Sequence, residues 1–361
     1  MTVLEGAPSF GAIGYGIQFP LVIGVIGQPQ EDSVNTSSGL RRAAQCLLLI
    51  SVAGFGTQSQ AQPYPSNPIR IVVPSSPSTP PDIVSRIIAS ELAVSEGWRV
   101  VVENRVGGSQ SVGVGDVLKD NPDGYSILAV SMPLTAIPAI MPKIGIRLDR
   151  DFVPIIQLSR SYNVLVVNPS LAVSSLPELV TLLKSEPDRY RFSSGGVGTP
   201  AHLIGEMFKL QTGVRTTHIP YQQIPQAITD LLNGTNHYMF ISSLPVINLV
   251  HSGQLRALAT TGEKRAPAMK EIPTAAEQGF PGLTTADWVG FAVKTGTPSK
   301  IVDRLNVALN KALTNPNVRE AIDKLGAETV GGTSSDFGVL IKSQLDHWAR
   351  VVKEAGIKTV E

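Results

Sequence analysis

The clearest regularity along the chain is an alternation of short buried strands with amphipathic helices. Apolar runs of four to six residues predict strands at 69–73, 99–102, 126–130, 163–167, 216–219, 237–241, 256–260 and 288–293. Helical spacing of apolar residues predicts helices beginning near residues 80, 176, 200 and 224, and again over 298–314, 318–325 and 336–353. Residues 149–153 are expected to be a loop, and 273–279 a short helix. This alternation predicts an α/β fold with mostly parallel sheets.

One stretch, residues 192–203, joins the end of a strand, a glycine loop and the start of a helix. Thr199 suits the N-cap of that helix, and Pro200 suits its first position, where a missing N–H loses no hydrogen bond. The unpaired N–H groups of a first helical turn favour an anion, and glycines let a ligand approach the backbone. The spacing fits neither a Walker loop nor a dinucleotide fingerprint, so a plain strand-to-helix turn remains the alternative.

A second polar loop follows the first predicted strand. Ser75, Ser76 and Ser78 lie at the carboxyl end of that strand, which is where open α/β sheets bind ligands. Thr79 and Asp82 have the spacing of a capping box for the next helix. Asp82 is therefore expected to have a structural role, whereas the serine hydroxyls are candidates for ligand contacts.

Composition limits the classes of function. The chain has 361 residues, of which 42% are hydrophobic and 16% charged, and its formal net charge is +1. This length suffices for two domains with their own cores. A near-neutral charge balance argues against a nucleic-acid partner, which would favour a basic face.

The first 61 residues differ from the rest. Arg41-Arg42, an apolar run over 43–55 and the small-residue end at Ala61 follow the order of a secretory signal peptide. We therefore expect residues 1–39 to be an upstream extension and 40–61 a signal peptide cleaved after Ala61; a buried core helix is the alternative. The single cysteine, Cys46, lies inside this run, so a mature chain beginning at Gln62 would contain no thiol.

Motifs of common catalytic sites are absent from the sequence. It contains no GxSxG elbow, no HExxH and no CxxC, and its five histidines share no ligand spacing. We expect neither a metal nor a cofactor. The polar residues at strand ends are mostly hydroxyl and amide groups, which bind ligands but transfer protons poorly near neutral pH. A binding protein is therefore favoured over an enzyme; the enzymatic alternative is a hydrolase that uses Ser76 or Ser131 with His202.

A series of short sequence blocks runs through residues 64–361. These blocks are Tyr64–Pro74, Val102–Arg105, Pro122–Tyr125, Asp151–Pro154, Val166–Ser170, Gly195–Leu203, Pro220-Tyr221, Thr229–Leu232, Leu255–Ala259 and Gly296–Pro298. In sequence and in order, they resemble blocks of the Bug family, the TctC-like periplasmic receptors of tripartite tricarboxylate transporters.

The resemblance implies a two-domain periplasmic binding protein of the type 2, Venus-flytrap class, with the ligand in the cleft between the domains. The first domain would comprise 62–163 plus 287–361, and the second 164–286. It also implies a monomer in the periplasm that binds a small carboxylate and delivers it to a membrane permease of one large and one small subunit. A sensory module that presents the ligand to a membrane histidine kinase is an alternative with the same pocket.

The family's two ligand loops correspond to Ser75–Pro81 and Gly196–His202. Tyr221 could instead be a core aromatic residue, and His202 a solvated residue on the polar face of its helix, paired with Glu206. Together with polar residues at other strand ends, the candidate ligand-binding residues are Ser75, Ser76, Ser78, Thr79, Ser131, Thr135, Gly196, Thr199, Ala201, His202, Tyr221, Gln222, Ser242 and Asp287.

The chain departs from the family pattern at both loops. Ser78 and Thr79 replace two glycines of the first loop, and Pro80-Pro81 offer no N–H groups. Gln222 follows Tyr221 where the family commonly has a lysine, and Ser242-Ser243 replace an Asp-Asn pair. These changes remove a cation and add neutral groups. They predict a ligand that is less anionic than a di- or tricarboxylate, or differently shaped.

Overall fold

The computed structural model describes residues 64–266, 269–357 and 359, and residues Gln62–Glu361 form one compact unit. The expected extension and signal peptide, 1–39 and 40–61, lie outside the described residues. Among the described residues, no helix is both long and apolar enough to cross a membrane.

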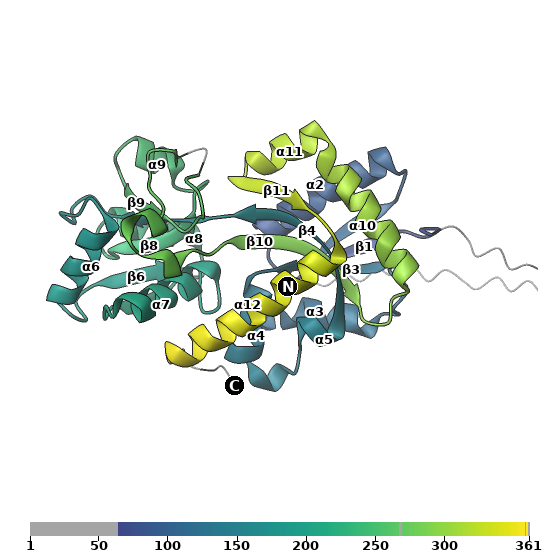
Figure 1. Cartoon of the computed structure of the whole chain (residues 1–361), viewed down its shortest axis with the longest axis horizontal. Helices are drawn as coiled ribbons and strands as arrows, with labels where there is room; N and C mark the ends of the chain where they lie inside the picture. Colours follow the sequence, from purple (N-terminus) through teal and green to yellow (C-terminus); the bar gives the residue numbers. More distant parts are fainter. Residues whose placement is uncertain (1–63, 267–268, 358, 360–361) are drawn as a thin grey trace, which may run out of the picture. The chain divides into compact units, whose positions relative to one another are not determined.

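Two separate sheets organise this unit, each with helices on both faces (Figure 1). The first sheet has six strands in the order β11-β4-β10-β3-β1-β2. Its strands are β1 (Ile69–Val73), β2 (Val100–Asn104), β3 (Ser126–Ser131), β4 (Phe152–Ser161), β10 (Asp287–Lys294) and β11 (Ala327–Gly331). The second sheet has five strands in the order β7-β6-β8-β5-β9. They are β5 (Asn163–Val167), β6 (Arg191–Ser194), β7 (Thr217–Pro220), β8 (Tyr238–Ser242) and β9 (Arg256–Thr260).

Helices that connect the strands cover the two sheets. Those of the first domain are α2 (Pro80–Ser95), α3 (Ser111–Lys119), α4 (Pro133–Ile140), α5 (Leu148–Asp151), α10 (Ser299–Thr314), α11 (Pro316–Asp323) and α12 (Ser334–Glu354). Those of the second domain are α6 (Leu176–Ser185), α7 (Pro200–Thr212), α8 (Ile224–Leu232) and α9 (Ile247–His251). Short 3₁₀ turns lie at Gly108–Gln110, Pro142–Ile144, Ala276–Gln278 and Pro281–Leu283.

Three apolar clusters fill the space between these layers. One face of the first sheet packs against α2, α10 and α11, and the second sheet packs against α8 and α9 on one of its faces. The third cluster covers the other face of both sheets. It is continuous between the domains, because α12 of the first domain packs against α7 of the second. The two domains therefore share part of one hydrophobic core.

The prediction of mostly parallel sheets is wrong. β1 pairs in parallel with β2 and β3, and β6 with β7 and β8, but the other five strand pairings are antiparallel. The reason is the path of the chain. It leaves the first domain along β4, enters β5 after one residue, Tyr162, and returns along β10. A returning strand runs against the outgoing one, so β4 and β10 pair antiparallel (Figure 1).

The other expected elements are present, but α3, α4 and α9 were not predicted from the sequence. The segment 149–153, expected to be a loop, contains α5 and the first residues of β4. The ten-residue strand β4 escaped prediction because Pro154 interrupts its apolar first half and its second half mixes polar with apolar residues, and the short strand β11 escaped it because it lacks an apolar run. All strands of the first sheet fall within 69–161 and 287–331, and those of the second within 163–260. The expected domain boundaries stay a prediction.

Candidate functional site

The two polar loops occupy equivalent positions in the two domains. Each follows the carboxyl end of a parallel strand, β1 or β6, and each leads into a helix that begins with Thr-Pro. The register between β1 and β3 brings Ser131, at the end of β3, to the same edge as the first loop. The register between β6 and β8 likewise brings Ser242 to the edge of the second loop. Polar groups therefore gather at one edge of each sheet, as open α/β folds require of a ligand site.

The first loop is held together by its own side chains. The Ser75 hydroxyl lies 2.8 Å from the Thr79 hydroxyl, which donates a hydrogen bond to the Ser76 carbonyl at 2.7 Å. The expected capping box does not form. Thr79 is the N-cap of α2 but makes no side-chain cap bond, because its hydroxyl is used by Ser76, and Asp82 instead accepts the Ser78 N–H at 2.9 Å.

The structure confirms the expected structural role of Asp82. It is buried, and Asn104 Nδ2 and Arg86 Nε donate to its Oδ1 at 2.9 and 3.0 Å. Burial raises the pKa of Asp82, but the hydrogen bonds from Arg86, Ser78 and Asn104 outweigh it and hold the pKa below its ordinary value. An ionised carboxylate thus occupies the N-terminal end of α2, where an anionic ligand would otherwise be attracted.

The second loop is also braced, but by neutral groups. Ser194 Oγ accepts the Gly196 N–H at 3.0 Å, and the Thr199 hydroxyl donates to the Gly196 carbonyl at 2.7 Å. Gly196 and Gly198 have φ values of +113° and +82°. Residues with a side chain rarely adopt these values, so the backbone conformation requires glycine at both positions. A Cβ built on Gly198 would lie 3.6 Å from Ile140 of α4, so this loop of the second domain lies close to a helix of the first.

The second loop leaves an array of unpaired donors. Within the described residues, the N–H groups of Val197, Ala201 and His202 have no acceptor. Those of Gly196, Gly198 and Thr199 bond to Ser194 Oγ, His202 Nδ1 and the Gly196 carbonyl. Because no carboxylate caps α7, its N-terminal end combines unpaired N–H groups with the positive end of the helix dipole.

Two imidazole rings, the buried His202 and the half-buried His218, support this loop. His202 is only 4% exposed, and its Nδ1 accepts the Gly198 N–H at 3.2 Å. Its ring centroid is 4.3 Å from that of His218, whose Nε2 lies 2.6 Å from Ser194 Oγ. Burial, together with the nearby Lys209, lowers the pKa of His202 to about 4, and burial, His202 and Lys209 lower that of His218 to about 3. Both rings are therefore neutral at neutral pH.

The alternative that His202 is a solvated residue on the polar face of its helix, paired with Glu206, is wrong. His202 and Glu206 are both buried, and Glu206 pairs with Lys209 Nζ at 2.8 Å rather than with His202. The apolar cluster shared by the domains packs around α7. This packing also covers the helix face on which the sequence of α7 places polar residues. His202 therefore supports the loop from within, and it contributes its backbone N–H to the array of donors.

Several predicted residues use their side chains within the protein. The Tyr221 hydroxyl donates to Asp230 Oδ2 at 2.6 Å and accepts from Asn236 Nδ2 at 2.7 Å. The Thr135 hydroxyl donates to the Met132 carbonyl at 2.6 Å and is buried. For these two residues, and for Ser75, Thr79 and Thr199, the bonds within the chain leave less hydrogen-bonding capacity for a ligand than the sequence suggests.

Other predicted residues keep unpaired side-chain groups. Among the described residues, the hydroxyls of Ser76, Ser78, Ser131 and Ser242 and the amide of Gln222 make no hydrogen bond within the chain. Ser131 is buried and Ser242 half-buried, whereas Ser76, Ser78 and Gln222 are exposed. Neither Ser76 nor Ser131 is hydrogen-bonded to His202, the pairing on which the hydrolase alternative depends.

Asp287 lies at the start of β10, where the chain returns to the first domain. Its Oδ1 accepts the N–H of Trp288 at 2.9 Å, and the carboxyl group has no cationic partner in the described part of the chain. Burial raises the pKa of Asp287 to about 6, although this backbone hydrogen bond opposes the shift.

Two asparagines were missed by sequence reasoning. Asn104 links the first loop to α2: its Nδ2 donates to the Ser75 carbonyl at 3.0 Å and to Asp82, while its Oδ1 accepts from Arg86. Asn163 opens β5 and is 4% exposed, yet its Nδ2 has no acceptor. The sequence signal for both residues was an asparagine at the boundary of a predicted strand. Asparagine at such a position is also typical of a simple turn, so the signal did not indicate a functional role.

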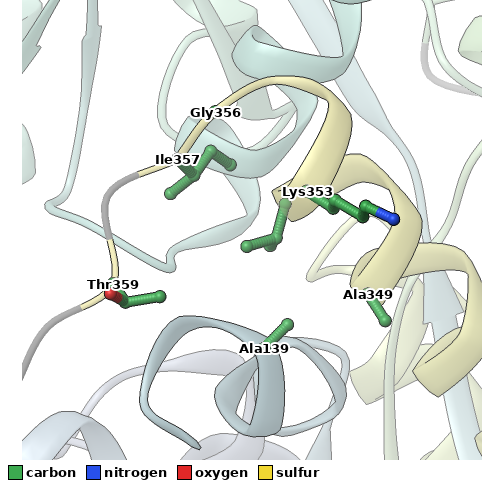
Figure 2. Close-up of a pocket in the computed structure, with 7 residues that line it drawn as sticks. Ala139, Ala349, Lys353, Gly356, Ile357 and Thr359 are labelled. Carbon is green, nitrogen blue, oxygen red and sulfur yellow. The ribbon is translucent and has the colours of Figure 1, made fainter.

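A shallow pocket of about 470 Å³ lies elsewhere, between α4 and the C-terminal end of α12 (Figure 2). Ala139, Ala349, Val352 and Ile357 give it apolar walls, with Lys353 beside them. None of the predicted ligand residues lines this pocket. Among the described residues, no three His, Cys, Asp or Glu side chains are grouped so that they could hold a metal ion.

Comparison with known proteins identifies the family. Residues 84–357 match the tripartite tricarboxylate transporter family receptor, TctC. The chain belongs to this family. It is 34% identical to protein BugT of Bordetella pertussis over 313 residues, which covers 86% of this chain and 96% of BugT.

Two solved structures share the fold. The periplasmic binding protein BugD is 29% identical, with a TM-score of 0.71, and covers 82% of this chain and 100% of its own. Rpa4515 of R. palustris, solved with adipate, is 30% identical, with a TM-score of 0.73 and the same coverage. The resemblance to Bug-family receptors and the two-domain, type 2 periplasmic binding fold are thus confirmed. The family is one of periplasmic substrate receptors.

The neutral imidazole pair predicts sensitivity to acid. An unfolded histidine binds a proton near pH 6.5, but folded His202 does so only near pH 4, so stability is lost as the pH falls between these values. Substituting His202→Gln keeps a neutral acceptor for the Gly198 N–H and removes this proton uptake. From pH 7.5 to 4.5, we expect the free energy of unfolding to fall by about 2 kcal/mol less in the variant than in the wild type.

Urea unfolding at the two pH values measures this difference. The matched control is His251→Gln on the exposed surface of α9, which should behave as the wild type does. An equal loss of stability in His202→Gln and the wild type would contradict the assignment.

Proposed function

We propose that this protein is a periplasmic receptor that binds a small carboxylate between its two domains and delivers it to a membrane permease of one large and one small subunit. The observation that carries the proposal is the array of unpaired N–H groups of Val197, Ala201 and His202 at the start of α7. Such an array suits an anion without any basic side chain. The closeness of Gly198 to Ile140 of the other domain supports a site between the domains.

The energetics are sufficient for micromolar binding. A hydrogen bond to a charged group contributes roughly 1.5–3 kcal/mol, and the end of a helix dipole adds up to ~1 kcal/mol. A micromolar dissociation constant corresponds to about −8 kcal/mol. Three or four such bonds therefore reach this range even after the cost of ordering the ligand.

The first loop supports a ligand of low charge. The ionised Asp82 occupies the N-terminal end of α2, and Pro80 and Pro81 contribute no N–H groups there. The two ends of the site are thus unequal, since one attracts an anion and the other already holds one. We propose that the ligand carries fewer carboxylates than citrate.

A thermal-shift screen tests this function. The panel comprises mono-, di- and tricarboxylates, amino acids, aromatic acids and neutral amides. We expect a saturable rise in melting temperature with one class of small carboxylate, followed by calorimetry in which citrate binds no more tightly than a monocarboxylate. No shift with any compound in a folded preparation, or much tighter binding of citrate, would contradict the proposal. Turnover of a bound compound would favour the hydrolase alternative.

The substitution Ala201→Pro tests the α7 donors directly. It removes one unpaired N–H and recreates the Thr-Pro-Pro sequence with which α2 already begins, so the helix should still form. We expect the affinity for the best carboxylate of the panel to fall about 10- to 100-fold, measured by titration calorimetry. Lys300→Pro, at the second position of the exposed start of α10, is the matched control. Unchanged affinity in Ala201→Pro would contradict a role for this N–H.

We also propose that residues 40–61 are a signal peptide cleaved after Ala61, and that 1–39 are an upstream extension absent from the mature protein. The order of Arg41-Arg42, the apolar run and Ala61 supports this. N-terminal sequencing of the periplasmic protein checks it. A mature protein that starts at Gln62 is expected, and a start well before Gln62 would contradict it.

A further inference from the structure

Two polar side chains at the crossing between the domains lack partners that could satisfy them. The carboxyl group of Asp287 is bonded only to the N–H of Trp288, and Asn163 Nδ2 has no acceptor among the described residues. Asn163 is 4% exposed. A buried donor of this kind costs stability unless something binds it, so each such group in a native protein requires an explanation.

The strand pairing brings these two residues close together. Asp287 is the first residue of β10 and pairs with Ser161, the last residue of β4. Asn163 follows two residues after Ser161 as the first residue of β5. One strand spacing and two residues of chain therefore separate Asp287 from Asn163. Both residues belong to the crossing segments rather than to either ligand loop.

In each domain, the side chain lies on the sheet face that is covered by the helix following the ligand loop. Side chains alternate along a strand, so Asp287 shares a face with Val289 and Phe291, which pack on α2. Asn163 shares a face with Leu165 and Val167, which lie in the cluster around α7. α2 and α7 are the helices that the two ligand loops begin.

The positions along the sheet edges also agree. β10 is two strands from β1, and β5 is two strands from β6, so each residue lies roughly 10 Å across its sheet from the end of the strand that carries the loop. Its neighbours at the edge are the candidates Ser131 and Ser242: Ser131 pairs with Val289, and Ser242 pairs with Asn163. Loops on two sides and crossing strands beneath would enclose a small ligand.

The chemistry of the two groups differs. The Asn163 amide donates a hydrogen bond and suits an oxygen of the carboxylate held by α7. The Asp287 carboxylate accepts hydrogen bonds or pairs with a cation, and no Lys, Arg or His of the described residues satisfies it. A plain aliphatic acid would offer Asp287 only repulsion or apolar contact, whereas a hydroxyl or ammonium group on the ligand would satisfy it.

We infer that Asp287 and Asn163 determine specificity at this site, and that they select a small carboxylate that also carries a hydroxyl or ammonium group. This inference rests on the proposed receptor function and narrows its ligand class. Asn163 binds the carboxylate from the crossing strands, and Asp287 accepts a hydrogen bond from the second group of the ligand.

Titration calorimetry with matched ligand sets tests the inference on the purified protein. One set is propanoate, lactate and alanine; the other is succinate, malate and aspartate. We expect the wild type to bind the hydroxyl or amino member of at least one set 10-fold or more tightly than the unsubstituted acid. In Asp287→Asn that preference should fall at least fivefold while the affinity for the unsubstituted acid is kept.

Asn163→Asp exchanges the donor for an acceptor of the same shape. We expect it to weaken all carboxylates of a set by 10-fold or more without changing their order. Asp346→Asn on the exposed face of α12 and Asn248→Asp on α9 are the matched controls and should bind as the wild type does. If Asn163→Asp does not fold, as judged by thermal unfolding, Asn163→Ser removes the same donor and carries the test.

The outcomes separate this inference from the function on which it rests. If the wild type binds propanoate or succinate as tightly as the substituted acids, or if Asp287→Asn keeps the full preference, the inference is overturned and the receptor function stands. If the folded wild type binds no carboxylate of either set or of the wider panel, the receptor function fails and the inference with it.

Discussion

The structure depends on the way in which the chain passes twice between the domains. It leaves along β4 with one residue before β5, and it returns into β10, which pairs antiparallel with both β3 and β4. Hydrogen bonding between the outgoing and returning strands fixes the start of β10 beside the end of β4. As a result, the first residues of β5 and β10 lie at the carboxyl edges of the parallel strands, where the ligand loops also lie. The crossing would thus form the floor of the proposed site as well as the connection between the domains.

The two ligand loops are alike in sequence and differ in charge. Both run from a strand into a helix that begins with Thr-Pro. The first is braced by the ionised Asp82 with Asn104 and Arg86, so the end of its helix already holds a negative charge. The second is braced by Ser194 and two neutral imidazoles, and its N–H groups remain available. In the proposed site, this asymmetry would direct an anion towards α7, because a helix end that is capped by a carboxylate offers little attraction to another anion.

Burial explains why the second loop uses histidines for support. His202 contacts His218, which stacks on Phe192 of the apolar cluster that the two domains share, and a charge beside this cluster would be poorly solvated. Neutral rings can accept hydrogen bonds from the loop. Because they carry no negative charge, they do not compete with an anionic ligand for the positive N-terminal end of α7. The same burial leaves the donor of Asn163 without a partner, so the interior near the crossing combines groups that are satisfied with groups that are not.

The sequence alone determined the local features of this protein. Apolar runs located most strands, helical spacing and Thr-Pro pairs located the helix starts, and the polar loops after β1 and β6 were evident, as was the family. Strand direction was decided by tertiary structure, because antiparallel pairing of β4 and β10 arises from a return path of more than a hundred residues that no local pattern records. Burial of His202 and Glu206 was decided by packing of the shared core over a face that looks polar in one dimension. The incomplete hydrogen bonding of the Asp287 carboxyl group and the Asn163 amide was likewise a tertiary outcome, since it depends on which groups every neighbour in space provides.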